Sequence, residues 1–110
     1  MGSKNDSYYI EKVLNEINII IDYTKGLSYE ELLKDQMTLD AAMFRMQQMV
    51  EQIENLSQGF KDTYNEFPWN NIIGFRNRIV HEYGKTDYTT VYETISNDIY
   101  RLKGLFESLL

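Results

Sequence analysis

Cysteine is absent from this sequence, and proline, tryptophan and histidine each occur once. Without cysteine there can be no disulfide framework and no cysteine-based zinc site. A single histidine also argues against a histidine-rich metal centre, so we expect no metal and no cofactor. No apolar run approaches the length of a membrane span, and no signal-peptide pattern is present. We therefore expect a cytoplasmic protein without membrane contacts.

Positive charge is also scarce, because 11 Lys and Arg face 17 Asp and Glu, a net charge of −6. Phosphate contacts need local positive potential, so this charge balance disfavours non-specific nucleic-acid binding. The deficit is uneven: residues 61–86 carry four basic and three acidic side chains, whereas both flanking segments are net acidic. The same segment holds the single proline, tryptophan and histidine, which makes it the candidate functional segment.

Apolar residues recur at helical spacing through most of the chain, and no segment alternates as a strand would. The pattern predicts amphipathic helices over about 10–21, from 35 or 38 to 58, over 68–83 and from 88 to 109. A short extra helix is expected over 28–34, with Ser28 and Glu31 as a capping box. At 110 residues the chain is long enough for one core. The predicted fold is all-α: an antiparallel four-helix bundle with an extra short helix, forming a single domain over residues 1–110.

The third predicted helix combines an apolar face with charged residues. Pro68 suits its first position, and Gly84 suits the position after its last turn. On a regular helix Arg76 falls near the middle of the apolar face, roughly 7.5 Å along the axis and about 140° around from His81. The two side chains would then meet only if the helix is distorted, or if a second helix or a second copy of the chain completes the site.

An ordinary structural role for these residues is the alternative. Arg76 can be a buried cation paired with Glu51 or Glu54, because a guanidinium keeps its charge and needs a partner. His81 would then be a surface histidine at a helix end.

The string from Phe67 to Tyr83, Phe-Pro-Trp-Asn-Asn-Ile-Ile-Gly-Phe-Arg-Asn-Arg-Ile-Val-His-Glu-Tyr, resembles the signature of the HepT-like branch of the HEPN superfamily. The match is an Arg-polar-x3-His-x-Tyr string. A first helix of the Glu-Lys-Val-Leu-x-x-Ile type and an acidic Glu51 in the second helix are collinear with it. One departure is visible: relatives often have Ile-Gly-Glu where this chain has Met-Val-Glu at 49–51.

The resemblance implies a HEPN-like homodimer that acts as the toxin of a toxin–antitoxin pair, with a minimal nucleotidyltransferase as its antitoxin partner. The implied activity is metal-independent endoribonuclease cleavage of RNA. The implied catalytic residues are Arg76, Asn77 and His81, with Glu51 and Arg78 supporting them. The antitoxin is expected to silence the toxin by adenylylating Tyr83.

These residue types suit RNA cleavage. RNA supplies its own nucleophile, the 2′-OH, and an imidazole can accept its proton or protonate the leaving 5′ oxygen. Arg76 can offer two N–H groups to the phosphorane, whose charge grows in the transition state. Asn77 can orient His81 or bind a phosphate oxygen. Because each chain has one histidine, the second proton transfer needs the other subunit's His81 or water.

Two other functions are compatible with the sequence, because one fold carries many functions. The chain can be a non-catalytic helical partner, or the substrate-binding subunit, of a minimal nucleotidyltransferase. It can also be a plain dimerisation module in which Arg76 forms a structural ion pair.

Overall fold

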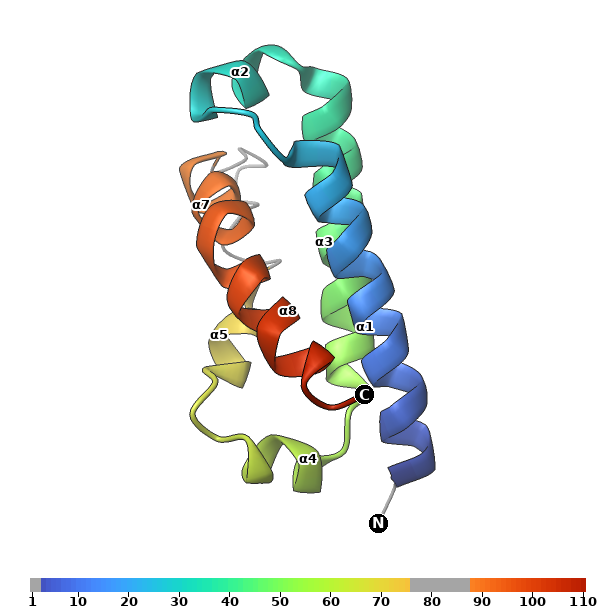
Figure 1. Ribbon diagram of the computed structural model, residues 1–110. Coiled ribbons are helices and arrows are strands. Elements are labelled where there is room, and N and C mark those ends of the chain that lie inside the picture. Colours follow the sequence, from blue (N-terminus) through green and yellow to red (C-terminus); the bar gives the residue numbers. More distant parts are fainter. Residues whose placement is uncertain (1–2, 76–87) are drawn as a thin grey trace.

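The structure is a computed structural model that describes residues 3–75 and 88–110. All regular structure in these residues is helical and none is strand, which confirms the predicted all-α class. The two longest helices, α1 (Ser3–Thr24) and α3 (Gln36–Glu54), run antiparallel and side by side, joined by the short α2 (Tyr29–Lys34) (Figure 1). Alongside these two helices lies a third helical rod, which packs on α1. It comprises α7 (Tyr88–Glu93), the π-helical turn η1 (Thr94–Asp98) and α8 (Ile99–Glu107).

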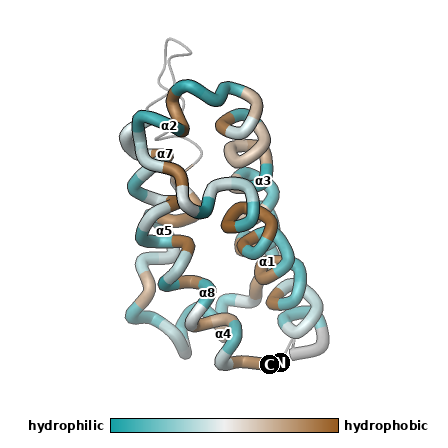
Figure 2. Tube along the Cα trace, turned by 45° about the horizontal axis from the view of Figure 1, so that its top comes forward, coloured by the Kyte–Doolittle hydropathy of each residue, from teal (hydrophilic) through white to brown (hydrophobic). Residues whose placement is uncertain are grey.

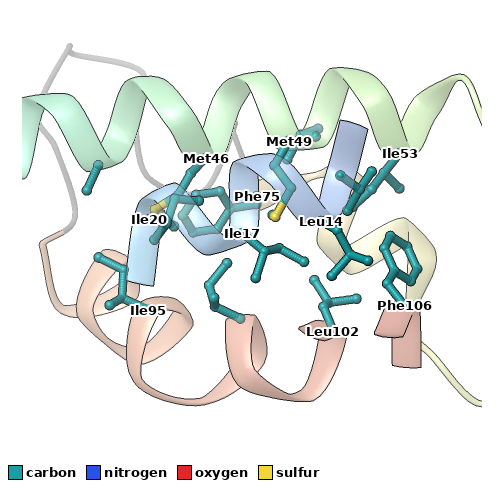
Figure 3. Packing of buried hydrophobic residues seen from close by; sticks show 14 of the residues in the cluster. Leu14, Ile17, Ile20, Met46, Met49, Ile53, Phe75, Ile95, Leu102 and Phe106 are labelled. Carbon is teal, nitrogen blue, oxygen red and sulfur yellow. The ribbon is translucent and has the colours of Figure 1, made fainter. Parts of the chain in front are cut away.

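The core lies where these rods face one another. Apolar positions recur in bands along the helices, separated by polar ones, as amphipathic helices require (Figure 2). From α1 the side chains of Leu14, Ile17 and Ile20 point into the core, where they meet side chains from α3, η1 and α8 (Figure 3). Within residues 3–75 and 88–110, the predicted apolar stripes therefore lie in the core or pack against it, as the spacing indicated.

The caps of α2 and α3 follow directly from local sequence. The Ser28 hydroxyl accepts a hydrogen bond from the Glu31 N–H at 3.1 Å, and Glu31 accepts one from the Ser28 N–H at 2.9 Å, so the predicted capping box is confirmed. Asp35 caps α3 by accepting hydrogen bonds from the hydroxyl and the N–H of Thr38. Both bonds favour the carboxylate and hold the pKa of Asp35 below its ordinary value.

The second predicted helix ends earlier than expected. It was predicted to continue to Gln58, but α3 stops at Glu54, and α4 (Gln58–Thr63) starts a new direction. The cause is a distant contact: Ser57 is extended, and its N–H and hydroxyl donate to the Asp6 carboxylate at 2.8 and 2.6 Å. The Ser57 hydroxyl in turn accepts from the Phe60 N–H, so it serves as the N-cap of α4.

The third predicted helix is interrupted. The structure has α5 (Trp69–Ile73), with Pro68 just before it rather than at its first helical position, a turn at Gly74, and helical backbone again at Phe75. Glycine is a poor residue inside a helix, which explains where the break falls. The prediction of one regular helix over 68–83 was therefore wrong at Gly74, and the angular relation predicted between Arg76 and His81 lies outside the described residues. Because the structure describes only the start of this segment, the four-helix arrangement stays a prediction.

Two methionines of α3 belong to the core. Met46 and Met49 are buried, whereas Met43 is half-buried. Val50, where the sequence departs from the signature that it resembles, is fully buried as well, so its branched side chain fills core volume. Within the part of the chain that the structure describes, no helix combines the length and apolarity that crossing a membrane requires.

The bond between the start of α1 and the start of α4 can be tested directly. Asp6 is 8% exposed, and its replacement by alanine leaves the Ser57 N–H without an acceptor. We expect Asp6→Ala to lower the free energy of unfolding by about 1–3 kcal/mol in urea denaturation. The matched control Asp22→Ala removes an exposed carboxylate from the same helix and is expected to change it by less than about 0.5 kcal/mol. Equal effects of the two substitutions would contradict this role of Asp6.

Candidate functional site

The motif residues predicted to act on RNA fall in the segment between α5 and α7. Arg76, Asn77, Arg78, His81 and Tyr83 all lie outside the described residues. The structure does define both flanks of the motif, and it places Glu51.

The flank before the motif is anchored in the core. Phe75 is 2% exposed and immediately precedes Arg76 in the sequence. With Met49, Thr94 and Leu102 it lines a small cavity of about 10 Å³, so it lies between α3 and the η1–α8 rod (Figure 3). A ring buried among three elements fixes the backbone where the motif starts.

An aromatic cluster holds α5 against α8 and α4. The Trp69 ring lies 5.9 Å from Phe60 and 6.4 Å from Phe106, centroid to centroid. Its indole N–H donates to the Tyr64 carbonyl at 3.0 Å, which satisfies the one polar group of a nearly buried side chain. The single tryptophan of the motif string is therefore a positioning residue for α5.

The flank after the motif begins at α7 and continues into the π-helical turn η1. Tyr92 of α7 packs edge-on against Tyr29 of α2, with 5.3 Å between ring centroids. In η1, Thr94 and Ile95 are buried and Asp98 is half-buried. Single π-helical turns occur often at functional sites. The extra residue in such a turn changes the direction in which the following side chains point. Here the turn directs Asp98 toward α5, where it lines two cavities.

Glu51 faces away from this anchored flank. It is exposed on α3, about 200° around the helix from the buried Met49. It continues a row on the outer side of α3 with Met37 and Phe44, spaced seven residues apart, which are 84% and 54% exposed. A supporting role for Glu51 would therefore be exerted at the outer surface of α3.

A further cavity on α5 was not foreseen from the sequence. It has a volume of about 310 Å³ and lies between the start of α5 and the junction of η1 with α8. Phe67, Asp98 and Arg101 contribute to its walls, and Leu102 contributes an apolar surface. In sequence, Asp98 and Arg101 look like an ordinary exposed i, i+3 pair, and only the fold brings them to Phe67.

No group of three or more histidine, cysteine, aspartate or glutamate side chains is placed to hold a metal ion within residues 3–75 and 88–110. Most of the motif, including the single histidine, lies outside these two ranges.

Comparison with known proteins places this arrangement in a family. The model of the family described as ribonuclease HepT-like matches residues 13–109. A protein of Caldanaerobacter subterraneus subsp. tengcongensis, named as a candidate RNase, is 30% identical over 102 residues, covering 93% of this chain and 91% of the relative. A protein of Thermococcus cleftensis, named probable ribonuclease HepT, is 30% identical over 101 residues and 92% of each chain. No solved structure matches.

The chain therefore belongs to the HepT-like ribonuclease family. This confirms the family indicated by the motif string and the prediction of an endoribonuclease. The match covers the described core, both flanks and the intervening motif, so the described helices are the scaffold of a ribonuclease of this class.

Proposed function

We propose that this protein is the ribonuclease toxin of a toxin–antitoxin pair and cleaves RNA without a metal through the Arg76–Tyr83 motif. The observation that carries the proposal is the family match over residues 13–109, which contains the whole motif string. The buried Phe75 supports it, since a fixed backbone directly before Arg76 is what a preorganised cationic site needs.

The proposed reaction uses the nucleophile that RNA carries. His81 accepts the proton of the 2′-OH as the 2′ oxygen attacks phosphorus, and the bond from phosphorus to the 5′ oxygen breaks. An imidazolium or water returns a proton to the leaving oxygen. The products are a 2′,3′-cyclic phosphate and a free 5′-OH. Arg76 stabilises the phosphorane through two N–H groups, and Asn77 orients His81 or binds a phosphate oxygen.

A homodimer would supply the second histidine. The outer row of α3 supports this assembly, because two large apolar side chains, Met37 and Phe44, point into solvent there. Glu51 lies in the same row, so a partner docked on α3 would cover it. Met46 and Met49 do not contribute to this interface, because they are core residues.

The partner we propose is a minimal nucleotidyltransferase that attaches AMP to the Tyr83 hydroxyl. The added phosphodiester is negatively charged and would pair with Arg76, the group proposed to receive the RNA phosphate. The modified tyrosine would then occupy the site as a mimic of RNA.

The catalytic proposal predicts that His81→Ala and Arg76→Ala each reduce cleavage of single-stranded RNA by at least about 100-fold. Circular dichroism and sedimentation should be unchanged, and a chelator should not alter the wild-type rate. Glu66→Ala, an exposed substitution before α5, is the control and should cleave normally. Undiminished cleavage by folded His81→Ala protein, or strict dependence on a divalent ion, would remove the mechanism.

The dimer proposal predicts that Phe44→Glu shifts the sedimenting species toward the 13.1 kDa monomer, because it places a charge in the proposed apolar contact. Tyr100→Glu changes a similarly exposed aromatic residue of α8 and should leave assembly unchanged. A wild-type protein that sediments only as a monomer at micromolar concentration would contradict the shared site.

The antitoxin proposal predicts that incubation with the cognate nucleotidyltransferase and ATP adds the mass of AMP to the wild-type protein and nothing to Tyr83→Phe. Intact-mass spectrometry measures both. The control is Tyr88→Phe, a nearby half-buried tyrosine of α7, which should be labelled like the wild type. Equal labelling of all three proteins would place the modification elsewhere.

A further inference from the structure

The 310 Å³ cavity between α5 and the η1–α8 junction has the features of a small-ligand site. Its volume is at the lower end of the range of pockets that hold small molecules. Its surfaces combine the half-buried ring of Phe67 and the buried Leu102 with two charged side chains, Asp98 and Arg101. One aromatic face, one apolar surface and a few polar groups match the requirements of a flat heteroaromatic ring.

The spacing of two of these groups fits such a ring. The guanidinium carbon of Arg101 lies 6.0 Å from the centroid of the Phe67 ring. A flat ring stacked between them needs about 7 Å, twice the contact distance of about 3.5 Å. Arg101 would move outward by about 1 Å, and its side chain is 65% exposed. Its contact with Asp98, at 4.0 Å between partly exposed groups, is weak and costs little to lose.

The carboxylate of Asp98 is the group that can select among rings. Its only recorded interaction in the described part of the chain is the long contact with Arg101. A carboxylate can accept but not donate hydrogen bonds, so it favours a ligand with an amino group. Adenine and cytosine carry an exocyclic amino group, whereas uracil presents carbonyl oxygens at the equivalent edge.

We propose that this cavity holds one unpaired base of the RNA substrate, stacked between Phe67 and Arg101 and read through its amino group by Asp98. The inference rests on the proposed ribonuclease function and names a base-binding site for it. Single-stranded RNA is commonly recognised by stacking bases on aromatic rings and guanidinium planes. Asn71 lies on the cavity wall, five residues before Arg76 in the sequence. Five residues span at most about 18 Å, so the cavity wall and the start of the catalytic motif are separated by no more than that length of chain.

The single tryptophan provides a signal for binding that does not depend on cleavage. The Trp69 ring lies 5.6 Å from the Phe67 ring, so a base stacked on Phe67 should change its fluorescence. The probes are tetranucleotides of adenosine, cytidine or uridine with 2′-O-methyl groups, which cannot undergo attack by the 2′ oxygen. We expect the wild-type protein to bind the adenosine and cytidine probes at least about tenfold more tightly than the uridine probe.

Substitutions separate stacking from amino-group recognition. Phe67→Leu should weaken binding of every probe about fivefold or more, whereas Phe67→Tyr keeps the ring and should bind like the wild type. Asp98→Asn should reduce the preference over uridine to within about twofold. Glu107→Gln removes one negative charge from α8, where Glu107 pairs with Lys103, and should retain the preference. If Phe67→Leu does not fold, the preference of Asp98→Asn still decides the question.

The outcomes distinguish this inference from the catalytic proposal. Equal binding of all three probes by the wild type, or an unchanged preference in Asp98→Asn, overturns the base site even if His81→Ala abolishes cleavage. A preference that Asp98→Asn loses and Glu107→Gln retains supports the base site. Normal cleavage by His81→Ala would then overturn only the catalytic assignment.

Discussion

The apolar seam between α1 and α3 is the constraint on which the other elements depend. Ile17 and Ile20 of α1 and Ala42 and Met46 of α3 have no exposed surface, so the two helices are closely packed along this seam. At the edge of the seam Arg45 donates to Glu16 at 3.3 Å, which helps to hold the relative register. Because the seam aligns two long antiparallel helices, it creates one common apolar face, and α5, η1 and α8 pack on it.

Anchoring next to the motif follows from that face. Phe75 follows the turn at Gly74 and is buried in the core, although on one regular helix it would point about 120° away from Trp69. Both flanks of the motif thus end on packed helices. A cationic site gains from such support, because charges that are already held in position need no reorganisation during the reaction.

An acidic ribonuclease has to obtain affinity for RNA from local contacts. With a net charge of −6, the chain as a whole repels phosphate. Salt also screens the long-range attraction between the basic residues of the motif and the phosphates of RNA. Stacking on an aromatic ring is short-ranged and depends less on charge. A base-binding cavity beside α5 would therefore offset the unfavourable field of the protein, and it would align the strand relative to the catalytic residues.

Sequence by itself determined the all-α class, the core stripes, the capping box at Ser28 and, through the Arg76–Tyr83 string, the family, because periodicity and motifs are local properties. Only the tertiary structure decided where α3 ends, since Ser57 is held by Asp6, 51 positions away. It also decided that Phe75 is core and that Phe67, Asp98 and Arg101 share one cavity. These features depend on contacts between segments distant in the chain, and spacing along one helix carries no information about which distant segment will pack against it.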